Sequence, residues 1–389
     1  MTRVLIVGVS TRGFAESAAR AGYDVVAVDG FGDLDLRARA GAVFVARAGG
    51  RFSLRSALRR ARALARDATC YVANLENHPR AVQLLSRDGA LWGNRPAVLR
   101  AVRDPLALAR ALARRGLATP AARRRAPRER TGKWLIKPLA SGGGSGVAPW
   151  QGGAVGAATY LQQRIGGRPG SVIFAADGRR AVVLGVSHAL VGDPRFGAAG
   201  FRYCGSIVTT PAEPLRQHVT RLATAVTEQF GLVGVNGVDF VVANGVPYAV
   251  EVNPRYTASM ELVERRHGLS IFETHVRACT GTLPQFDIGH IPRRDTLREL
   301  PDPPDPLVPP VIGKAILYAR RAVIPEATAR WLADDDVRDV PASGELIGPG
   351  RPICTIFASG PTVARCRAAL VARARALYRA LAPASRRIA

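Results

Sequence analysis

Lysine is almost absent from this chain. Only Lys133, Lys137 and Lys314 are lysine among 55 basic residues, so 52 are arginine. The net charge of +25 raises the hypothesis of nucleic-acid binding. However, the arginines are spread along an alanine-rich chain that has neither a zinc-finger spacing nor an aromatic RNA-binding run, so we expect no specific nucleic-acid partner. A lysine kept in such a background indicates a site that needs a compact ammonium group.

Paired cysteines and long apolar runs are also missing. The five cysteines are scattered without a CxxC pair, which argues against a disulfide framework or zinc site and favours reduced thiols in the cytosol. No apolar run reaches the 18 residues of a membrane span, and the first residues, MTRVLIVGVS, lack the layout of a signal peptide. We expect a cytoplasmic protein of two or three domains.

The N-terminal segment predicts a parallel β-α-β unit. Residues 3–29 alternate between an apolar run, a loop at 8–13, a helical pattern and a second apolar run. The loop, GVSTRG, lacks the middle glycine of a dinucleotide-binding GxGxxG motif. Glu76 and Asn77 follow a later predicted strand, at the edge where α/β folds bind ligands. They are candidate substrate contacts, with a helix cap as the alternative.

Two short apolar runs, 238–242 and 248–252, flank Asn-Gly and predict a β-hairpin. If a three-residue loop including Gly245 joins them, Asp239 lies opposite Glu251; a two-residue loop would displace Asp239 by one position. Facing carboxylates repel unless a cation lies between them, and Asn253 offers a further oxygen. Such oxygens suit Mg²⁺. The alternative is an ordinary polar-faced surface hairpin.

A glycine-rich segment follows a short apolar strand that carries Lys137. Small residues allow backbone N–H groups to approach anionic oxygens closely, and the preceding lysine adds a point charge. The order differs from a Walker loop, because the lysine precedes the glycines. We expect this segment to contact phosphate, with a flexible linker as the alternative. Its residues are Ser141, Gly142, Gly143, Gly144, Ser145 and Gly146.

These motifs together resemble the ATP-grasp superfamily. Asp239 in GVDF and Glu251, Asn253 and Arg255 in EVNPR are similar to its metal-binding end. The resemblance implies that Asp239, Glu251 and Asn253 hold Mg²⁺ (or Mn²⁺). It also implies catalytic roles for Lys137, which would hold the phosphates of ATP, and for Arg255, which would steady the transferred phosphoryl group.

The resemblance also implies a nucleotide site. The glycine-rich segment is similar to the hairpin that closes over ATP in this superfamily. The basic residue expected at the phosphates is Arg103, since the usual lysine is absent. Gln162, Gln163 and Ile165 match the stretch that lies along adenine. Many members place an acidic residue there, where this chain has Gln163, so the ribose contacts stay unassigned.

Three further residues are candidate substrate contacts, in two strands around a glycine-rich loop. They are His188, Arg202 and Tyr203. The implied fold is α/β, an ATP-grasp fold with a Rossmann-like N-terminal domain and a small C-terminal β-rich subdomain. The expected boundaries are 1–95 for the N-terminal domain, 96–283 for the ATP-grasp domain with a lid at about 119–170, 284–310 for a Pro-rich linker, and 311–382 for the C-terminal subdomain with its terminal helix.

The implied function is an ATP-dependent ligase. It would join a small carboxylate to an amine (or thiol) through an acyl phosphate, converting ATP to ADP and phosphate. VDGFGDLD, NLENHP and FRYCGSI are most similar to members associated with methanofuran- and tetrahydromethanopterin-type C1 cofactors, some of which attach glutamate. The alternatives are a biotin-carboxylase- or purine-pathway-like enzyme and, from another class, a non-catalytic basic nucleotide- or nucleic-acid-binding protein. The oligomeric state stays open, with a homodimer as the candidate.

Overall fold

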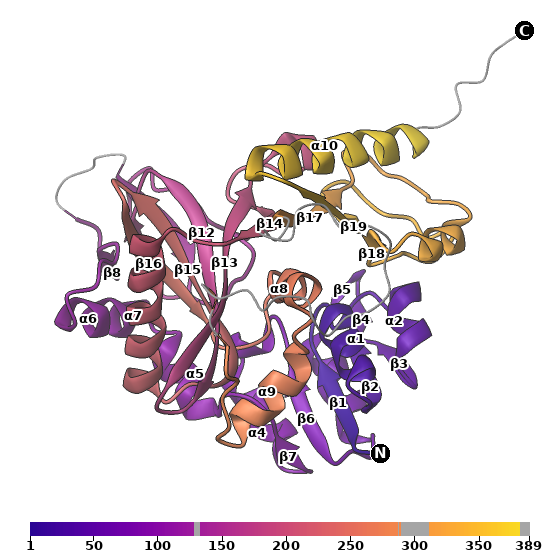
Figure 1. The fold of residues 1–389 in the computed structure, drawn as a ribbon, viewed down its shortest axis with the longest axis horizontal. Coiled ribbons are helices and arrows are strands. Elements are labelled where there is room, and N and C mark those ends of the chain that lie inside the picture. Colours follow the sequence, from indigo (N-terminus) through magenta and orange to yellow (C-terminus); the bar gives the residue numbers. More distant parts are fainter. Residues whose placement is uncertain (128–132, 287, 289–310, 382–389) are drawn as a thin grey trace, which may run out of the picture.

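The computed structural model describes residues 1–127, 133–286, 288 and 311–381. Most of the predicted linker, 284–310, lies outside these ranges. The described chain contains both helices and strands, arranged around three main sheets (Figure 1). The expected α/β class is therefore confirmed. Within the described ranges, no helix combines the length and the apolar character needed to cross a lipid bilayer.

The N-terminal sheet has five parallel strands in the order β3-β2-β1-β6-β7. Residues 4–7 of its central strand are fully buried, as expected for a parallel strand covered on both faces. The predicted β-α-β unit is confirmed as β1, α1 and β2. The elements of this region are β1 (Arg3–Val7), α1 (Arg12–Arg20), β2 (Asp24–Asp29), α2 (Leu34–Arg39), β3 (Ala42–Val45), β4 (Arg47–Ala48), β5 (Arg51–Phe52), α3 (Leu54–Arg62), β6 (Ala68–Tyr71), η1 (Leu75–Asn77), α4 (Pro79–Leu85) and β7 (Ala90–Leu91).

Two helices lead from this sheet into a small four-stranded sheet of order β10-β9-β11-β8. The helices meet at Arg103-Asp104-Pro105, as predicted. The side chain of Asp104 caps the second helix by accepting hydrogen bonds from the N–H groups of Leu106 (2.9 Å) and Ala107 (3.2 Å). The elements are α5 (Pro96–Val102), α6 (Pro105–Arg114), β8 (Ala122–Arg123), β9 (Trp134–Pro138), β10 (Ala148–Pro149) and β11 (Thr159–Gln163).

The largest sheet has eight strands in the order β16-β15-β12-β13-β14-β17-β19-β18. Strands of the predicted C-terminal subdomain therefore extend the sheet of the preceding domain, through pairing of β14 with β17. The strands are β12 (Arg168–Asp177), β13 (Ala181–Val191), β14 (Tyr203–Thr209), β15 (Val233–Ala243), β16 (Val246–Asn253), β17 (Val311–Tyr318), β18 (Val337–Arg338) and β19 (Pro352–Gly360). The helices are η2 (Pro194–Phe196), α7 (Glu213–Phe230), α8 (Met260–His267), α9 (Ile271–Cys279), η3 (Thr328–Ala333) and α10 (Val363–Ala380).

Alternation along β12 places the large sheet between two apolar cores. Ile173 and Ala175 belong to a core shared with α8, α9 and the N-terminal sheet. Val172 and Phe174 point the other way, into a core shared with α5, α6 and α7. Helices thus cover both faces of this part of the sheet (Figure 1). The β15–β16 hairpin is consequently held on both sides, which fixes the polar groups at its end.

Candidate functional site

Asp239 lies opposite Glu251 in the β15–β16 hairpin, as the sequence predicted. The structure does not contain the three-residue loop on which this facing was made conditional. Ala243 pairs with Val246, so the loop has two residues, Asn244 and Gly245, both with positive φ (49° and 79°). Two positive φ values are typical of a type I′ hairpin turn. A bulge restores the pairing of Asp239 with Glu251. Phe240 pairs with Ala249, and Val250 is the extra, unpaired residue between Ala249 and Glu251.

The two carboxylates differ in their electrostatic surroundings. Burial and the nearby charge of Glu251 raise the pKa of Asp239 to about 6. Burial alone would raise the pKa of Glu251, but the charges of Arg103 and Lys137 outweigh it and hold that pKa below its ordinary value. Asn253 donates from Nδ2 to Asp239 Oδ2 at 3.0 Å, so the three predicted metal-binding side chains do lie together.

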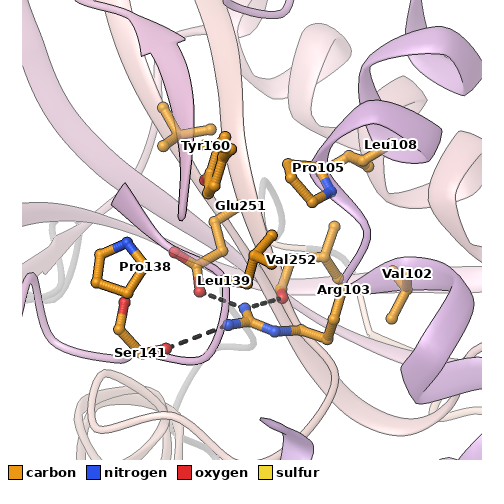
Figure 2. Close-up of a pocket in the computed structure, with 11 residues that line it drawn as sticks. Val102, Arg103, Pro105, Leu108, Pro138, Leu139, Ser141, Tyr160, Glu251 and Val252 are labelled. Carbon is orange, nitrogen blue, oxygen red and sulfur yellow. Dashed lines mark hydrogen bonds and ion pairs between the residues drawn. The ribbon is translucent and has the colours of Figure 1, made fainter. Parts of the chain in front are cut away.

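Arg103 connects three segments at this site. Its Nη1 donates to Glu251 Oε1 and to the carbonyl of Val252 (3.1 Å). Its Nη2 donates to Asn77 Oδ1 (2.8 Å) and to the carbonyl of Ser141 (3.2 Å). Figure 2 shows this guanidinium between Glu251 and Ser141, at a cleft. The side chain of Arg103 thus spans from the N-terminal region to the glycine-rich segment and the hairpin.

Lys137 lies on the buried face of β9. Its ammonium donates to Gln162 Oε1 at 3.0 Å, and Gln162 Nε2 donates to the carbonyl of Val250 at 3.0 Å. Burial lowers the pKa of Lys137, while the charges of Glu251 and Asp239 oppose that shift. Gln163, one residue on, points the other way and is exposed, with its Oε1 accepting from the N–H of Ala121 at 3.3 Å. Ile165 is half-buried just beyond β11.

The glycine-rich segment is docked against two other parts of the chain. Asn77 Nδ2 donates to the carbonyl of Ser141 at 3.2 Å, which adds to the bond from Arg103. The N–H of Tyr203 donates to the carbonyl of Gly143 at 3.0 Å. Gly144 has φ +77°, and a Cβ there would lie 1.8 Å from the carbonyl oxygen of Phe201. Only glycine can make this approach. Gly142 and Gly146 complete the segment with the exposed Ser145.

Glu76 reaches this site from the N-terminal region. It is 1% exposed, and Arg255 Nη2 lies 2.8 Å from its Oε1. The distance is that of an ion pair, but neither oxygen of Glu76 has a hydrogen-bond partner among the described residues. Arg255 also donates to the carbonyl of Tyr256 (2.8 Å) and to Asn253 Oδ1 (3.3 Å). A chain of polar contacts therefore runs from Glu76 through Arg255 to Asn253 and Asp239.

The remaining predicted contacts lie at varying distances from this cluster. Tyr203 touches it through its backbone, while its hydroxyl pairs with Ser206 Oγ at 2.8 Å. Arg202 is exposed and donates to the carbonyl of Gly350 at 2.9 Å, facing the C-terminal region. His188 is half-buried on β13, and burial lowers its pKa. Among the described residues, neither His188 nor Arg202 makes a hydrogen bond or ion pair with a side chain of the cluster.

Sequence reasoning missed Tyr160. Its buried ring faces Arg103 and Glu251 across a cleft that also contains Leu139 and Pro105 (Figure 2). The available signal was the two-residue spacing from Gln162, which places both side chains on one face of β11. The cleft has a volume of about 20 Å³. That is room for about one water molecule, so the segments that line the cleft around Arg103 pack closely together.

The donor set at the hairpin fits a divalent cation. Two facing carboxylates supply oxygen ligands of the type that Mg²⁺ prefers. Asn253, whose Nδ2 donates to Asp239, would add a third oxygen by turning its amide over. The raised pKa of Asp239 shows that its negative charge, next to that of Glu251, is poorly compensated. A bound cation would stabilise both charges. No group of three or more His, Cys, Asp or Glu side chains suited to a metal occurs in the described residues. Asn253 therefore has to complete the set.

The central part of the chain matches a known protein family. A family model described as an ATP-grasp domain matches residues 102–259, which include the site except for Glu76 and Asn77. An uncharacterized protein of Methanocaldococcus jannaschii is 26% identical over 156 residues, covering 40% of this chain and 33% of that protein. The match thus spans about a third of that relative's length.

Two solved structures are similar over almost the whole chain. The L-amino acid ligase from Bacillus licheniformis has a TM-score of 0.68 at 15% identity, covering 97% of each chain. The biotin carboxylase domain of 2-oxoglutarate carboxylase from Hydrogenobacter thermophilus, solved with MgADP, ADP and bicarbonate, has a TM-score of 0.68 at 13% identity, covering 92% of this chain and 86% of that one. The chain therefore has an ATP-grasp fold.

Proposed function

From the ATP-grasp domain at residues 102–259, we propose that this protein is an ATP-dependent ligase that uses ATP and Mg²⁺ (or Mn²⁺). It activates a small carboxylate as an acyl phosphate and transfers the acyl group to an amine, releasing ADP and phosphate. One observation carries the proposal. The facing carboxylates of Asp239 and Glu251 are flanked by three buried or half-buried cations, Lys137, Arg103 and Arg255. This charge pattern suits a metal–triphosphate complex.

Each cation has a distinct role in the proposal. Lys137, held by Gln162, presents a compact positive charge to the phosphates. The N–H groups of the Ser141–Gly146 segment surround them, and Arg255 steadies the transferred phosphoryl group. Mg²⁺, held by Asp239, Glu251 and Asn253, would neutralise charge on the phosphates. Backbone groups at Gln162 and Gln163 would pair with the adenine edge, and Ile165 would cover its face.

The chemistry requires no nucleophilic side chain. A carboxylate oxygen of the acid attacks the γ-phosphorus, and the bond to the β-γ bridging oxygen breaks to release ADP. The amine nitrogen then attacks the acyl carbon, the C–O bond to phosphate breaks, and the ammonium proton passes to solvent. The protein positions the reactants and stabilises negative charge.

We propose only the chemical class of the acid and of the amine. The L-amino acid ligase, similar over 97% of each chain, favours amino acids as substrates. Glutamate is the first to test, given the resemblance to enzymes of C1-carrier cofactor biosynthesis. Glu76 and Asn77 are proposed substrate contacts, because they lie in contact with Arg255 and Arg103. His188, Arg202 and Tyr203 stay lower-ranked candidates.

A second candidate is a carboxylase-type reaction. It is favoured by the similarity to the biotin carboxylase domain, a structure that contains bicarbonate. In that case the acid activated by ATP would be bicarbonate, and no amino acid would be required. That structure is of a domain dimer, and we propose a homodimer here, to be checked by light scattering.

The experiment is a coupled assay of ADP release. Purified protein with MgATP is screened against the 20 common L-amino acids, singly and in pairs, and against bicarbonate. A separate arm adds hydroxylamine, which traps an acyl phosphate as a hydroxamate. Glu251→Gln is the control for contaminating ATPases, since it removes a charge from the site with little change in shape. We expect pair-dependent ADP release that Glu251→Gln lowers at least about 100-fold. ADP release that Glu251→Gln leaves unchanged would contradict the proposal.

A further inference from the structure

Arg103 binds a carboxylate oxygen of Glu251, which is one of the proposed metal ligands. Its Nη1 donates to Glu251 Oε1 and to the carbonyl of Val252, which precedes Asn253. Glu251 thereby already has a cationic partner, and the pair is largely buried, with side chains 11% and 25% exposed. A divalent cation approaching Glu251 therefore has to displace a guanidinium or bind beside it, and like charges at contact distance repel strongly at a buried site.

Further hydrogen bonds orient the guanidinium toward Glu251. Its second amino group is held by Asn77 Oδ1 at 2.8 Å and by the carbonyl of Ser141 at 3.2 Å. The helix junction after α5 fixes its backbone, because the adjoining Asp104 caps α6. Lys137 adds a second positive charge that acts on both Asp239 and Glu251. Without phosphate, Arg103 is therefore bonded to Glu251, and the nearby charge of Lys137 acts on both carboxylates.

Phosphate oxygens are better partners for Arg103 than these neighbours. Two of its hydrogen bonds go to backbone carbonyls and one to an amide oxygen, which are neutral acceptors. A triphosphate offers several charged oxygens that match the planar fork of arginine. Moving Arg103 from Glu251 to a phosphate leaves Glu251 free to bind a cation, and the same phosphate supplies further oxygens to that cation.

We propose that Arg103 makes divalent-metal binding at Asp239 and Glu251 conditional on nucleotide, by occupying Glu251 until a phosphate takes its place. This inference rests on the proposed function, since it assumes a metal–nucleotide site. It predicts that one substitution changes the affinities for two ligands in opposite directions. Losing Arg103 strengthens metal binding to the nucleotide-free protein and weakens nucleotide binding. Damage to the fold would weaken both.

The test uses Mn²⁺ as the probe, with free Mn²⁺ measured by electron paramagnetic resonance on the full chain without nucleotide. Arg103→Gln is compared with the wild type and with Arg100→Gln. Arg100 is exposed on α5 one turn earlier, so its variant matches the change in net charge. The double variant Arg103→Gln with Asp239→Asn identifies the site. ATP affinity is measured by calorimetry without metal, and folding is checked by thermal melts. Arg103→Met gives the same comparison if the glutamine variant does not fold.

For Arg103→Gln we expect Mn²⁺ to bind at least about tenfold more tightly than to the wild type, an effect absent in Arg100→Gln and lost in the double variant. ATP should bind at least about tenfold more weakly. Equal Mn²⁺ affinity in the wild type and in Arg103→Gln overturns the inference, as does a gain that survives Asp239→Asn. If the wild type binds ATP neither with nor without Mg²⁺ and releases no ADP in the coupled assay, the proposed function fails instead, so the two failures are distinguishable.

Discussion

Asp239 and Glu251 face each other across one hairpin, yet their pKa values are displaced in opposite directions. The difference follows from which carboxylate holds a cation. Glu251 is bonded to Arg103, whereas the hydrogen bond to Asp239 comes from the neutral amide of Asn253. Of the two carboxylates, Asp239 therefore has the charge that is less compensated.

Asp239→Asn should stabilise the metal-free protein at neutral pH. The folded-state pKa of Asp239, about 6, is above its ordinary value, so protonation stabilises the fold at low pH and this contribution is lost as the pH rises through 6. Asparagine has no such penalty. We expect Asp239→Asn to raise the free energy of unfolding by about 1–3 kcal/mol at pH 7.5 and the gain to shrink towards pH 4. Denaturant titrations with chelator measure it. A gain that is equal at both pH values would contradict the assignment.

Lys137→Ala should weaken ATP binding or slow phosphoryl transfer. A charge-assisted contact contributes about 1.5–3 kcal/mol, which corresponds to roughly 10- to 100-fold in affinity or rate. The control is Lys133→Ala, since Lys133 is exposed and lies just before β9. Calorimetry and single-turnover assays measure the two effects. If both variants behave like the wild type, Lys137 does not contact the phosphates.

Gly144→Ala should release the glycine-rich segment from its docked position. A Cβ at Gly144 would lie 1.8 Å from the carbonyl oxygen of Phe201, and φ is +77°. Gly142→Ala is the matched control, because its φ is not in the left-handed region and nothing lies within 4 Å of a Cβ there. We expect faster amide hydrogen exchange over 141–146 and at Tyr203 in Gly144→Ala, and at least about a tenfold loss of activity. Equal exchange in the two variants would show that docking tolerates a side chain.

The large positive charge should bind DNA only weakly. If the charge of +25 is compositional background, binding to random duplex depends on phosphate neutralisation and falls steeply with salt. ADP release should persist at a salt concentration that abolishes DNA binding. Fluorescence anisotropy and the coupled assay on one preparation test this. Tight, sequence-selective DNA binding at physiological salt without ADP release would favour a nucleic-acid-binding protein.

Local sequence patterns predicted the secondary structure that carries the site residues. Strand alternation predicted the faces of Asp239 and Glu251, and the Asp104-Pro105 pair predicted the helix junction beside Arg103, whose role was implied by the family resemblance. The bulge at Val250 was not predictable from the local sequence. It arises because a two-residue turn has to be combined with a register that packs both faces of the sheet, and that packing involves distant segments. The facing of Asp239 and Glu251 was expected only with a three-residue loop, and it occurs with a two-residue loop because of this bulge.

Contacts between distant side chains were beyond the reach of sequence patterns. Nothing in the spacing indicates that Asn77 bonds to Arg103 and to Ser141, since these contacts depend on how the N-terminal sheet packs against the rest. Tyr160 had a weak local signal, its spacing from Gln162, but an aromatic residue on a strand is more often core. The roles of all these residues in binding stay predictions.

The pairing of β14 with β17 has a consequence for how the chain can be divided. Gly205 through Val208 pair with Ile312 through Ala315, so residues 311–381 complete a sheet that the earlier residues begin. A cut after residue 310 would leave an open strand edge on each piece, and open edges promote aggregation. The two pieces should behave as halves of a split protein, insoluble apart and complementary when co-expressed. Exchanging the C-terminal part with that of another protein would require matching this edge strand by strand.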